Sequence, residues 1–151
     1  MTRHSSAGGA MTREETTRFY DRWHQAWSAQ DVTALANLYA GDCKVTSPMF
    51  GPIQGRAAVT ESFKRVFKAF PDWKLKTEQL IIDGDRVAVV FSINVTHSGE
   101  FMGLPATGRT AQVTGVLVQK LDDDEIEEEL RLYDFTALLV QVGVLRAKPG
   151  H

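Results

Sequence analysis

The sequence predicts an α+β fold in which helices pack on one face of a curved antiparallel sheet. In the first half of the chain, apolar residues recur at the three- and four-residue spacing of amphipathic helices. In the second half they alternate with polar residues, as they do in strands. Helices followed by a meander of long strands are typical of an α+β domain rather than of alternating βα units.

The length and composition indicate one domain. The chain has 151 residues, of which 43% are hydrophobic, and this is enough to bury a substantial core. We expect a flexible leader at residues 1–11, a single domain at 12–146 and a tail at 147–151. The net charge of −2 gives no basic field for nucleic acid or an anionic membrane.

The chain also lacks the usual signals for a membrane or secretory route. Its apolar stretches are far shorter than the ~18–20 residues of a membrane span, and the N-terminus has no apolar signal-peptide core. We therefore expect a soluble, cytoplasmic protein. A single cysteine, Cys43, excludes an intrachain disulfide and a multi-cysteine metal site.

Three helices are expected before residue 71. Thr12 and Glu15 fit a capping box at the start of the first helix. A shorter helix is expected near Asp31, followed by a brief strand at 43–46 and a loop to residue 55. The third helix begins near Arg56 and ends before Pro71. The apolar faces of these helices carry Phe19, Tyr20, Trp23, Ala26 and Trp27 in the first, Leu35, Leu38 and Tyr39 in the second, and Val59, Phe63, Val66, Phe67 and Phe70 in the third.

The rest of the chain is expected as strands and one short helix. Alternation predicts strands at 73–77, 87–97 and 109–119, and a last strand from the acidic turn at 122–124 to residue 134. Asp83-Gly84 fits a hairpin turn. A short apolar helix follows at 135–140.

Asp134 is the first candidate for chemistry. Residues two apart share a face of a strand, so Asp134 is expected to point where Leu130 and Leu132 point. A carboxylate aimed into an apolar interior is a candidate general acid/base, because desolvation raises its pKa. The alternative is that Asp134 only caps the following helix.

His97 is the second candidate. It continues the face of Ile93 and Val95, so its imidazole could point inward and donate a hydrogen bond to a developing oxyanion. The alternative is a structural histidine that anchors the long loop after the strand. The spacing of the other histidines matches no metal motif, so no metal is expected.

A ligand pocket is predicted from aromatic and apolar side chains. The helix stripes could line it, or could be ordinary core. Apolar residues of the glycine-flanked loop at 99–108 could form a lid or a dimer contact. The predicted substrate-binding residues are Tyr20, Trp23, Trp27, Phe50, Phe63, Phe67, Phe101, Met102, Leu104, Leu130 and Leu132.

Several segments together resemble the SnoaL-like polyketide cyclase family. They are the run at 97–109, the strand that ends in Asp134 and the segment at 138–143, with support from 51–58 and 70–73. The resemblance covers roughly residues 15–145. It implies the fold of nuclear transport factor 2, a cone of curved sheet closed by helices around an apolar pocket.

The resemblance also implies a reaction. Characterised cyclases of this family close a ring of an aromatic polyketide by intramolecular aldol condensation without metal or cofactor, and Asp134 matches the position of their aspartate. Two departures concern the substrate: the turn at 122–124 is acidic, and Leu130 stands where a tryptophan is frequent.

Two functional classes remain open. One is a cofactor-independent cyclase or related acid/base enzyme that acts on an aromatic carbonyl compound. The other is a binding protein that holds a small apolar ligand, or dimerises, without turnover. Val113, Val116 and Val118 place apolar residues on both faces of one strand, which indicates a homodimer built through the sheet.

Overall fold

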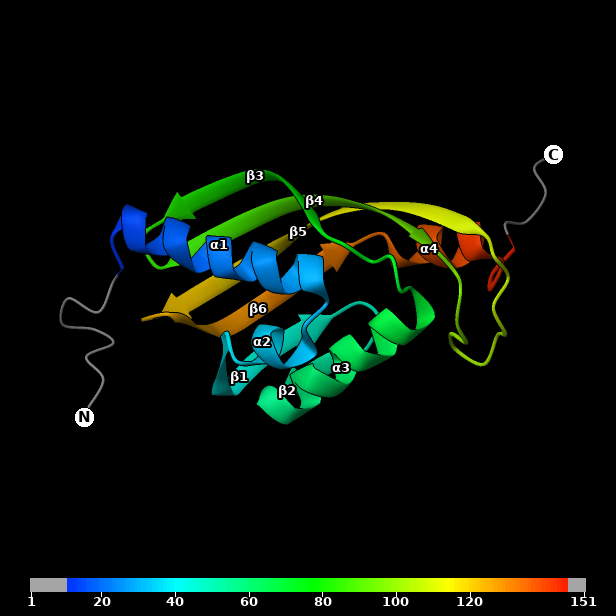
Figure 1. The fold of residues 1–151 in the computed structure, drawn as a ribbon, viewed down its shortest axis with the longest axis horizontal. Helices are drawn as coiled ribbons and strands as arrows, with labels where there is room; N and C mark the ends of the chain where they lie inside the picture. The colour runs from blue at the N-terminus through cyan, green and yellow to red at the C-terminus, as the bar shows by residue number, and fades with distance from the viewer. Residues whose placement is uncertain (1–10, 147–151) are drawn as a thin grey trace.

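The computed structural model describes residues 11–146, which form four helices and a six-stranded curved sheet (Figure 1). This confirms the predicted α+β class. In chain order the elements are α1 (Arg13–Ala29), α2 (Val32–Ala36), β1 (Tyr39–Ser47), β2 (Gly51–Gln54), α3 (Arg56–Ala69), β3 (Lys76–Asp83), β4 (Arg86–Thr96), β5 (Thr110–Asp122), β6 (Glu125–Tyr133) and α4 (Phe135–Val142). The predicted tail and all of the predicted leader except Met11 lie outside the described residues.

The helix starts follow from local hydrogen bonds. The Thr12 hydroxyl accepts a hydrogen bond from the Glu15 N–H, and the Glu15 carboxylate accepts one from the Thr12 N–H, so the predicted capping box is confirmed. Asp31 caps α2 through the Ala34 N–H. Tyr39 was expected on this helix, but it begins β1 and pairs with Ile126 of β6.

The strand order is β2-β1-β6-β5-β4-β3. Antiparallel pairing was expected throughout, but β1 pairs with β6 in parallel, so the sheet is mixed. Residues 51–54 were expected in a loop and instead form the edge strand β2, where Ile53 pairs with Val45. The hairpin at Asp83 and Gly84 is confirmed, with Gly84 in the left-handed conformation that the turn requires.

The helices α1 and α3 cover one face of the sheet, which we call the inner face (Figure 1). The core lies there, and β4 contributes buried residues at every second position from Val87 to Val95. Gly115 lets β5 and β6 approach closely, because a Cβ at this position would lie 2.8 Å from Tyr133 Cβ. No helix in the described range is long and apolar enough to cross a membrane.

The last strand turns its apolar side away from the helices. Leu130 and Leu132 are 39% and 46% exposed on the outer face, whereas Glu129 is 3% exposed on the inner face. A register shift explains this: Leu121 pairs with Ile126, but the preceding Lys120 pairs with Glu128, so β6 contains one extra residue. A one-residue bulge exchanges the faces of all residues beyond it. The predicted inward orientation of Leu130, Leu132 and Asp134 is therefore wrong.

Candidate functional site

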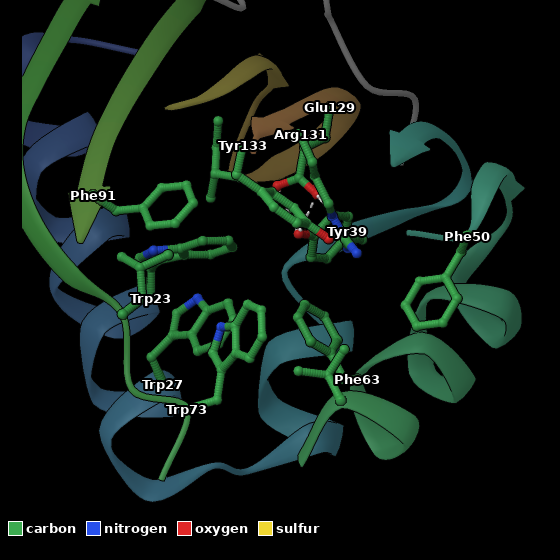
Figure 2. Close-up of a pocket in the computed structure, with 13 residues that line it drawn as sticks. Trp23, Trp27, Tyr39, Phe50, Phe63, Trp73, Phe91, Glu129, Arg131 and Tyr133 are labelled. Carbon is green, nitrogen blue, oxygen red and sulfur yellow. Dashed lines mark hydrogen bonds and ion pairs between the residues drawn. The ribbon is translucent and has the colours of Figure 1, made fainter. Parts of the chain in front are cut away.

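A small aromatic cavity lies between the inner face of the sheet, α1 and α3. Its free space is about 40 Å³, which is room for a few water molecules. Figure 2 shows the side chains of Glu129, Arg131 and Tyr39 gathered in one group, with a cluster of aromatic rings beside it. The lining residues are Trp23, Trp27, Tyr39, Phe50, Phe63, Val66, Trp73, Leu75, Phe91, Leu117, Glu129, Arg131 and Tyr133.

Glu129 is the centre of that polar group. Its carboxylate accepts hydrogen bonds from the Tyr39 hydroxyl at 2.8 and 2.9 Å and from Gln119 Nε2 at 2.5 Å. Arg131 Nε donates to the same carboxylate at 2.6 Å. Tyr20 extends the network, because its hydroxyl donates to Gln119 Oε1 at 2.5 Å. The carboxylate is thus held in one orientation by donors from three strands.

Burial makes this network electrostatically strong. Burial by itself lowers the pKa of Arg131, but the Glu129 charge and the hydrogen bonds around it outweigh that effect and hold the pKa above its usual value. Burial, and then the Glu129 charge, raise the pKa of Tyr39 well above its usual value, and the same two causes raise the pKa of Tyr20. Both phenols therefore remain protonated donors at neutral pH.

The remaining buried polar atoms of the cavity wall are donors. Within residues 11–146, Trp23 Nε1, Trp27 Nε1 and Arg131 Nη2 are buried without a hydrogen-bond partner. The Arg131 guanidinium also lies 5.2 Å above the Phe63 ring. Unpaired buried donors are costly unless an acceptor meets them. The wall is therefore suited to a ligand that carries acceptor oxygens.

The predicted pocket residues from the helices fall into two groups. Trp23, Trp27 and Phe63 line the cavity, and so does Phe50 from the β1–β2 turn. Phe67 lies behind them, with its ring 5.6 Å from that of Trp27. Tyr20 also lies behind the wall and contacts Trp23. Ligand binding by all of these residues stays a prediction.

Asp134 does not line the cavity. It is exposed, and its Oδ1 accepts a hydrogen bond from the Ala137 N–H at 2.8 Å, which makes it the N-cap of α4. The capping alternative therefore describes its geometry. A catalytic role for Asp134 stays a prediction, but its structural premise, a carboxylate aimed into the apolar interior, does not hold.

His97 is fully buried but also lies outside the cavity wall. Its Nδ1 is 2.9 Å from the Thr107 hydroxyl, and its backbone bonds to residues 108 and 109 across the long loop. Its ring packs between Phe70 and Phe101. These contacts fit the structural alternative, in which His97 anchors the loop.

The apolar loop residues form part of a separate groove. Phe101 and Leu104 close a small turn with two backbone hydrogen bonds of 3.0 and 2.9 Å. Phe101 is buried against Phe70, and Met102 is 57% exposed. Phe101 and Met102 line a groove outside the cone, next to Phe50, instead of the inner cavity.

Sequence reasoning missed Glu129, Arg131 and Tyr133, which form the inner face of β6. Opposite charges two residues apart that alternate with Leu130 and Leu132 were a usable signal, because such a pair shares one face of a strand. Glu129 is the last of the acidic residues that begin at Asp122, and this acidic run hid the signal. Among the described residues, no cluster of three or more His, Cys, Asp or Glu side chains could hold a metal ion.

The sequence profile of the SnoaL-like polyketide cyclase family matches residues 17–142. The chain belongs to this family. The match spans every element that forms the cavity wall, from α1 to β6. No curated protein matches the chain.

Solved structures agree with the family assignment. AclR from Streptomyces galilaeus, described as a candidate hydroxylase, has a TM-score of 0.79 and 25% identity, covering 91% of this chain and 87% of its own. IdmH from Streptomyces antibioticus, described as a candidate polyketide cyclase, has a TM-score of 0.72 and 26% identity, covering 84% and 97%. A Catenulispora acidiphila protein with a ketosteroid isomerase-like fold is 18% identical, with a TM-score of 0.71 and coverage of 92% and 100%. The family and these neighbours indicate a cyclase or another function of the nuclear transport factor 2-like fold, but the different descriptions of AclR and IdmH show that the fold does not determine the reaction.

Proposed function

We propose that this protein is a cofactor-independent acid/base enzyme of the cyclase type, which acts on a carbonyl compound held in the aromatic cavity. Glu129 is the proton acceptor and Arg131 stabilises the oxyanion. The observation that supports this most is the Glu129–Arg131 ion pair in the wall of a cavity lined mainly by aromatic and aliphatic side chains. Buried charge pairs in clefts are typical of functional sites.

The chemistry begins at a carbon between two carbonyl groups. Its proton moves to the Glu129 carboxylate, and the electron pair of the broken C–H bond delocalises onto a carbonyl oxygen. Arg131 Nη2 and the indole N–H groups of Trp23 and Trp27 are donors without partners in the described protein, so they can donate hydrogen bonds to the oxygen on which this negative charge develops. Because these donors are fixed in the cavity wall, little reorganisation is required.

An aldol ring closure uses the same groups. The carbanion forms a C–C bond to a second carbonyl carbon of the same molecule, and that carbonyl oxygen takes a proton, which Glu129 can return. Tyr39 and Gln119 hold the carboxylate in position for both transfers. The free space of about 40 Å³ limits the bound part of the substrate to a small group unless the aromatic wall moves.

Asp134 is the second candidate for the acid/base group. Its support is the family resemblance, which matches it to the aspartate of characterised cyclases. Its exposed, capping position gives it no access to the cavity as described. Variants of Glu129 and Asp134 therefore need to be compared in the same assay of proton abstraction.

The alternative function is binding of a small apolar ligand without turnover. The observation that favours it is the dense aromatic filling of the cone, where the rings of Trp27, Phe63 and Phe67 pack edge to face or stacked at 5.5 to 5.9 Å. Such a wall can hold a ligand by burial alone.

We also propose that the protein is a homodimer joined through the outer face of the sheet. Cross-strand pairs place apolar residues side by side there: Ala88 with Val118, Val118 with Leu130, and Val116 with Leu132. A contiguous exposed apolar patch on a sheet is typical of a subunit interface. A second copy of the chain would cover it.

Deuterium exchange tests the proposed proton transfer. The probe is ethyl benzoylacetate, whose CH₂ group lies between two carbonyls, and loss of its proton NMR signal in D₂O reports proton abstraction. The native protein is expected to accelerate exchange above buffer, and Glu129→Gln to lose at least ~100-fold of that acceleration. Asp134→Asn is the matched control and is expected to keep it.

The variants must first retain the fold, which circular dichroism and thermal unfolding would verify. Full exchange in Glu129→Gln together with loss in Asp134→Asn would reassign the acid/base role to Asp134. Tight binding of the probe with no acceleration by the native protein would favour the binding function.

A further inference from the structure

A second, larger hollow adjoins the inner cavity. It is a surface groove between the β1–β2 turn, α3 and the β4–β5 loop, with free space of about 350 Å³, within the range of small-molecule sites. Its apolar walls are Met49, Phe50, Phe101 and Met102. The proposed proton transfer makes no use of this groove.

Phe50 lines both the groove and the inner cavity. It lies in the β1–β2 turn, which is fixed because the buried Ser47 hydroxyl accepts hydrogen bonds from the N–H groups of Met49 and Phe50 at 3.1 and 3.2 Å. Figure 2 shows the Phe50 ring apart from the other aromatic side chains, next to α3. The two hollows thus share one aromatic wall, and a ligand long enough to pass Phe50 would occupy both.

The groove carries more positive than negative charge. Arg65 and Lys68 lie three residues apart on α3 and both line it. Neither forms an ion pair within residues 11–146, whereas the neighbouring Lys64 pairs with Glu61 at 3.3 Å. The one carboxylate of the groove wall, Glu100, accepts a hydrogen bond from the Gly103 N–H at 2.6 Å and so helps to form the loop.

The arrangement combines a cation with an aromatic surface. The Arg65 guanidinium lies 5.1 Å above the Phe50 ring, which keeps this cation at the boundary between groove and cavity. In the β4–β5 loop, Met102 has the left-handed backbone (φ 53°) that is unusual for a side chain of its size, and it remains 57% exposed. An apolar side chain held at the rim in this way can cover a bound ring.

We propose that this groove binds the anionic part of the ligand, and that the ligand is therefore an amphipathic organic anion, such as an aromatic carboxylate. Arg65 and Lys68 bind the negative group, and Met49, Phe50 and Met102 contact the adjoining rings. This inference adds a substrate class to the proposed function. Anion binding in the groove does not depend on that function; only the placement of a neutral carbonyl end of the ligand in the inner cavity, beyond Phe50, rests on it.

A matched pair of fluorescent probes tests the groove without requiring turnover. 8-Anilinonaphthalene-1-sulfonate is an aromatic anion, and N-phenyl-1-naphthylamine has the same rings without the sulfonate. The native protein is expected to bind the anion more tightly than the neutral probe. In the double variant Arg65→Gln/Lys68→Gln, affinity for the anion is expected to fall about tenfold, and affinity for the neutral probe to change less than about twofold.

Lys64→Gln is the control, because it removes a neighbouring cation of α3 that does not line the groove. Added salt is expected to weaken binding of the anion by the native protein and to have little effect on the double variant. Equal losses of both probes, or an anion affinity that the double variant retains, would overturn the proposal.

Glu129→Gln separates this inference from the proposed reaction. The variant is expected to bind the anionic probe as the native protein does, since the groove does not contain Glu129. Loss of deuterium exchange in Glu129→Gln with unchanged probe binding supports both proposals. Retained exchange in that variant, together with charge-dependent probe binding, would overturn the role of Glu129 as proton acceptor and leave the groove as an anion site.

Discussion

In an ordinary sheet that packs against helices, the inner face is apolar and the outer face is polar. The two faces of β6 show the reverse arrangement. On the inner face, Glu129, Arg131 and Tyr133 bring charge and a phenol into the core. On the outer face, Leu130 and Leu132 are exposed. A strand that only built a core would place the leucines inside and the charges in water. This reversal is the pattern expected if both proposals hold, with the inner face of β6 lining a site and its outer face forming a subunit contact.

The difference also changes what each carboxylate can do. Glu129 is buried, paired with a guanidinium and in contact with the cavity. Asp134, five residues later, is exposed and bonded to its own helix. These two carboxylates are close in sequence but lie in different environments, one buried against the cavity and one exposed at the start of a helix.

The largest expected effect comes from breaking the inner pair. Arg131→Met leaves Glu129 buried without its cation, so the free energy of unfolding should fall by about 3–5 kcal/mol. The double variant Glu129→Leu/Arg131→Met removes both charges and should recover most of that loss. Urea unfolding of the three proteins measures it, and equal stability of the native protein and Arg131→Met would contradict a buried pair.

The three tyrosines of the chain give a pH test of the cavity and of the hydrogen-bond network around Glu129. Burial raises the pKa of Tyr133 to about 12 from its usual value of 10.0, partly offset by Arg131, and the pKa values of Tyr20 and Tyr39 are raised as well. Raised folded-state pKa values give stability that is complete below about pH 10 and is lost as the pH rises through the folded values.

Ultraviolet absorbance of the phenolate ion measures this titration. The unfolded chain should ionise all three tyrosines near pH 10, and the folded protein should show almost no phenolate there. A folded protein that titrates one full tyrosine near pH 10 would contradict the buried network.

A substitution on the outer face of the sheet should change how strongly two copies of the chain associate. Leu132→Asp places a charge in the proposed interface and is expected to weaken the homodimer by about 2 kcal/mol, or ~30-fold, with the fold intact. Asn94→Asp, at an exposed position on β4, is the control. Sedimentation equilibrium across a concentration series measures the association constant. A native protein that stays monomeric over this series would contradict the proposed homodimer.

The smallest effect is expected at Asp134. Asp134→Ala loses the helix cap and should lower the free energy of unfolding by about 1 kcal/mol, whereas Asp134→Asn keeps a side-chain acceptor and should cost only a few tenths. Thermal unfolding compares the two. A loss of several kcal/mol in Asp134→Asn would mean that this carboxylate has buried partners.

Much of the fold could be predicted because its signals are local. The capping box at Thr12, the cap at Asp31 and the turn at Gly84 each depend on neighbouring residues, and the structure has all three. The parallel pairing of β1 with β6 depends on contacts between residues about 85 positions apart, such as Val45 with Glu129, which no local pattern encodes.

The candidate site was harder to predict for a related reason. The inward face of β6 was inferred from where its leucines lie, and one bulged residue after Ile126 reverses that inference. The helical spacing that suggested Trp23, Trp27 and Phe63 as wall residues is not affected by the bulge, and all three line the cavity. Their binding of a ligand stays a prediction. The apolar pattern thus predicted the walls of the cavity and missed its polar centre.

Carboxyl ¹³C NMR tests the central claim, that Glu129 and not Asp134 faces the ligand. The spectra of Glu129→Gln and Asp134→Asn assign the two carboxyl carbons in labelled native protein, and ethyl benzoylacetate is then added in steps. We predict that the Glu129 resonance shifts in a saturable manner while the Asp134 resonance stays in place. A shift of the Asp134 resonance with no change at Glu129 would contradict this account.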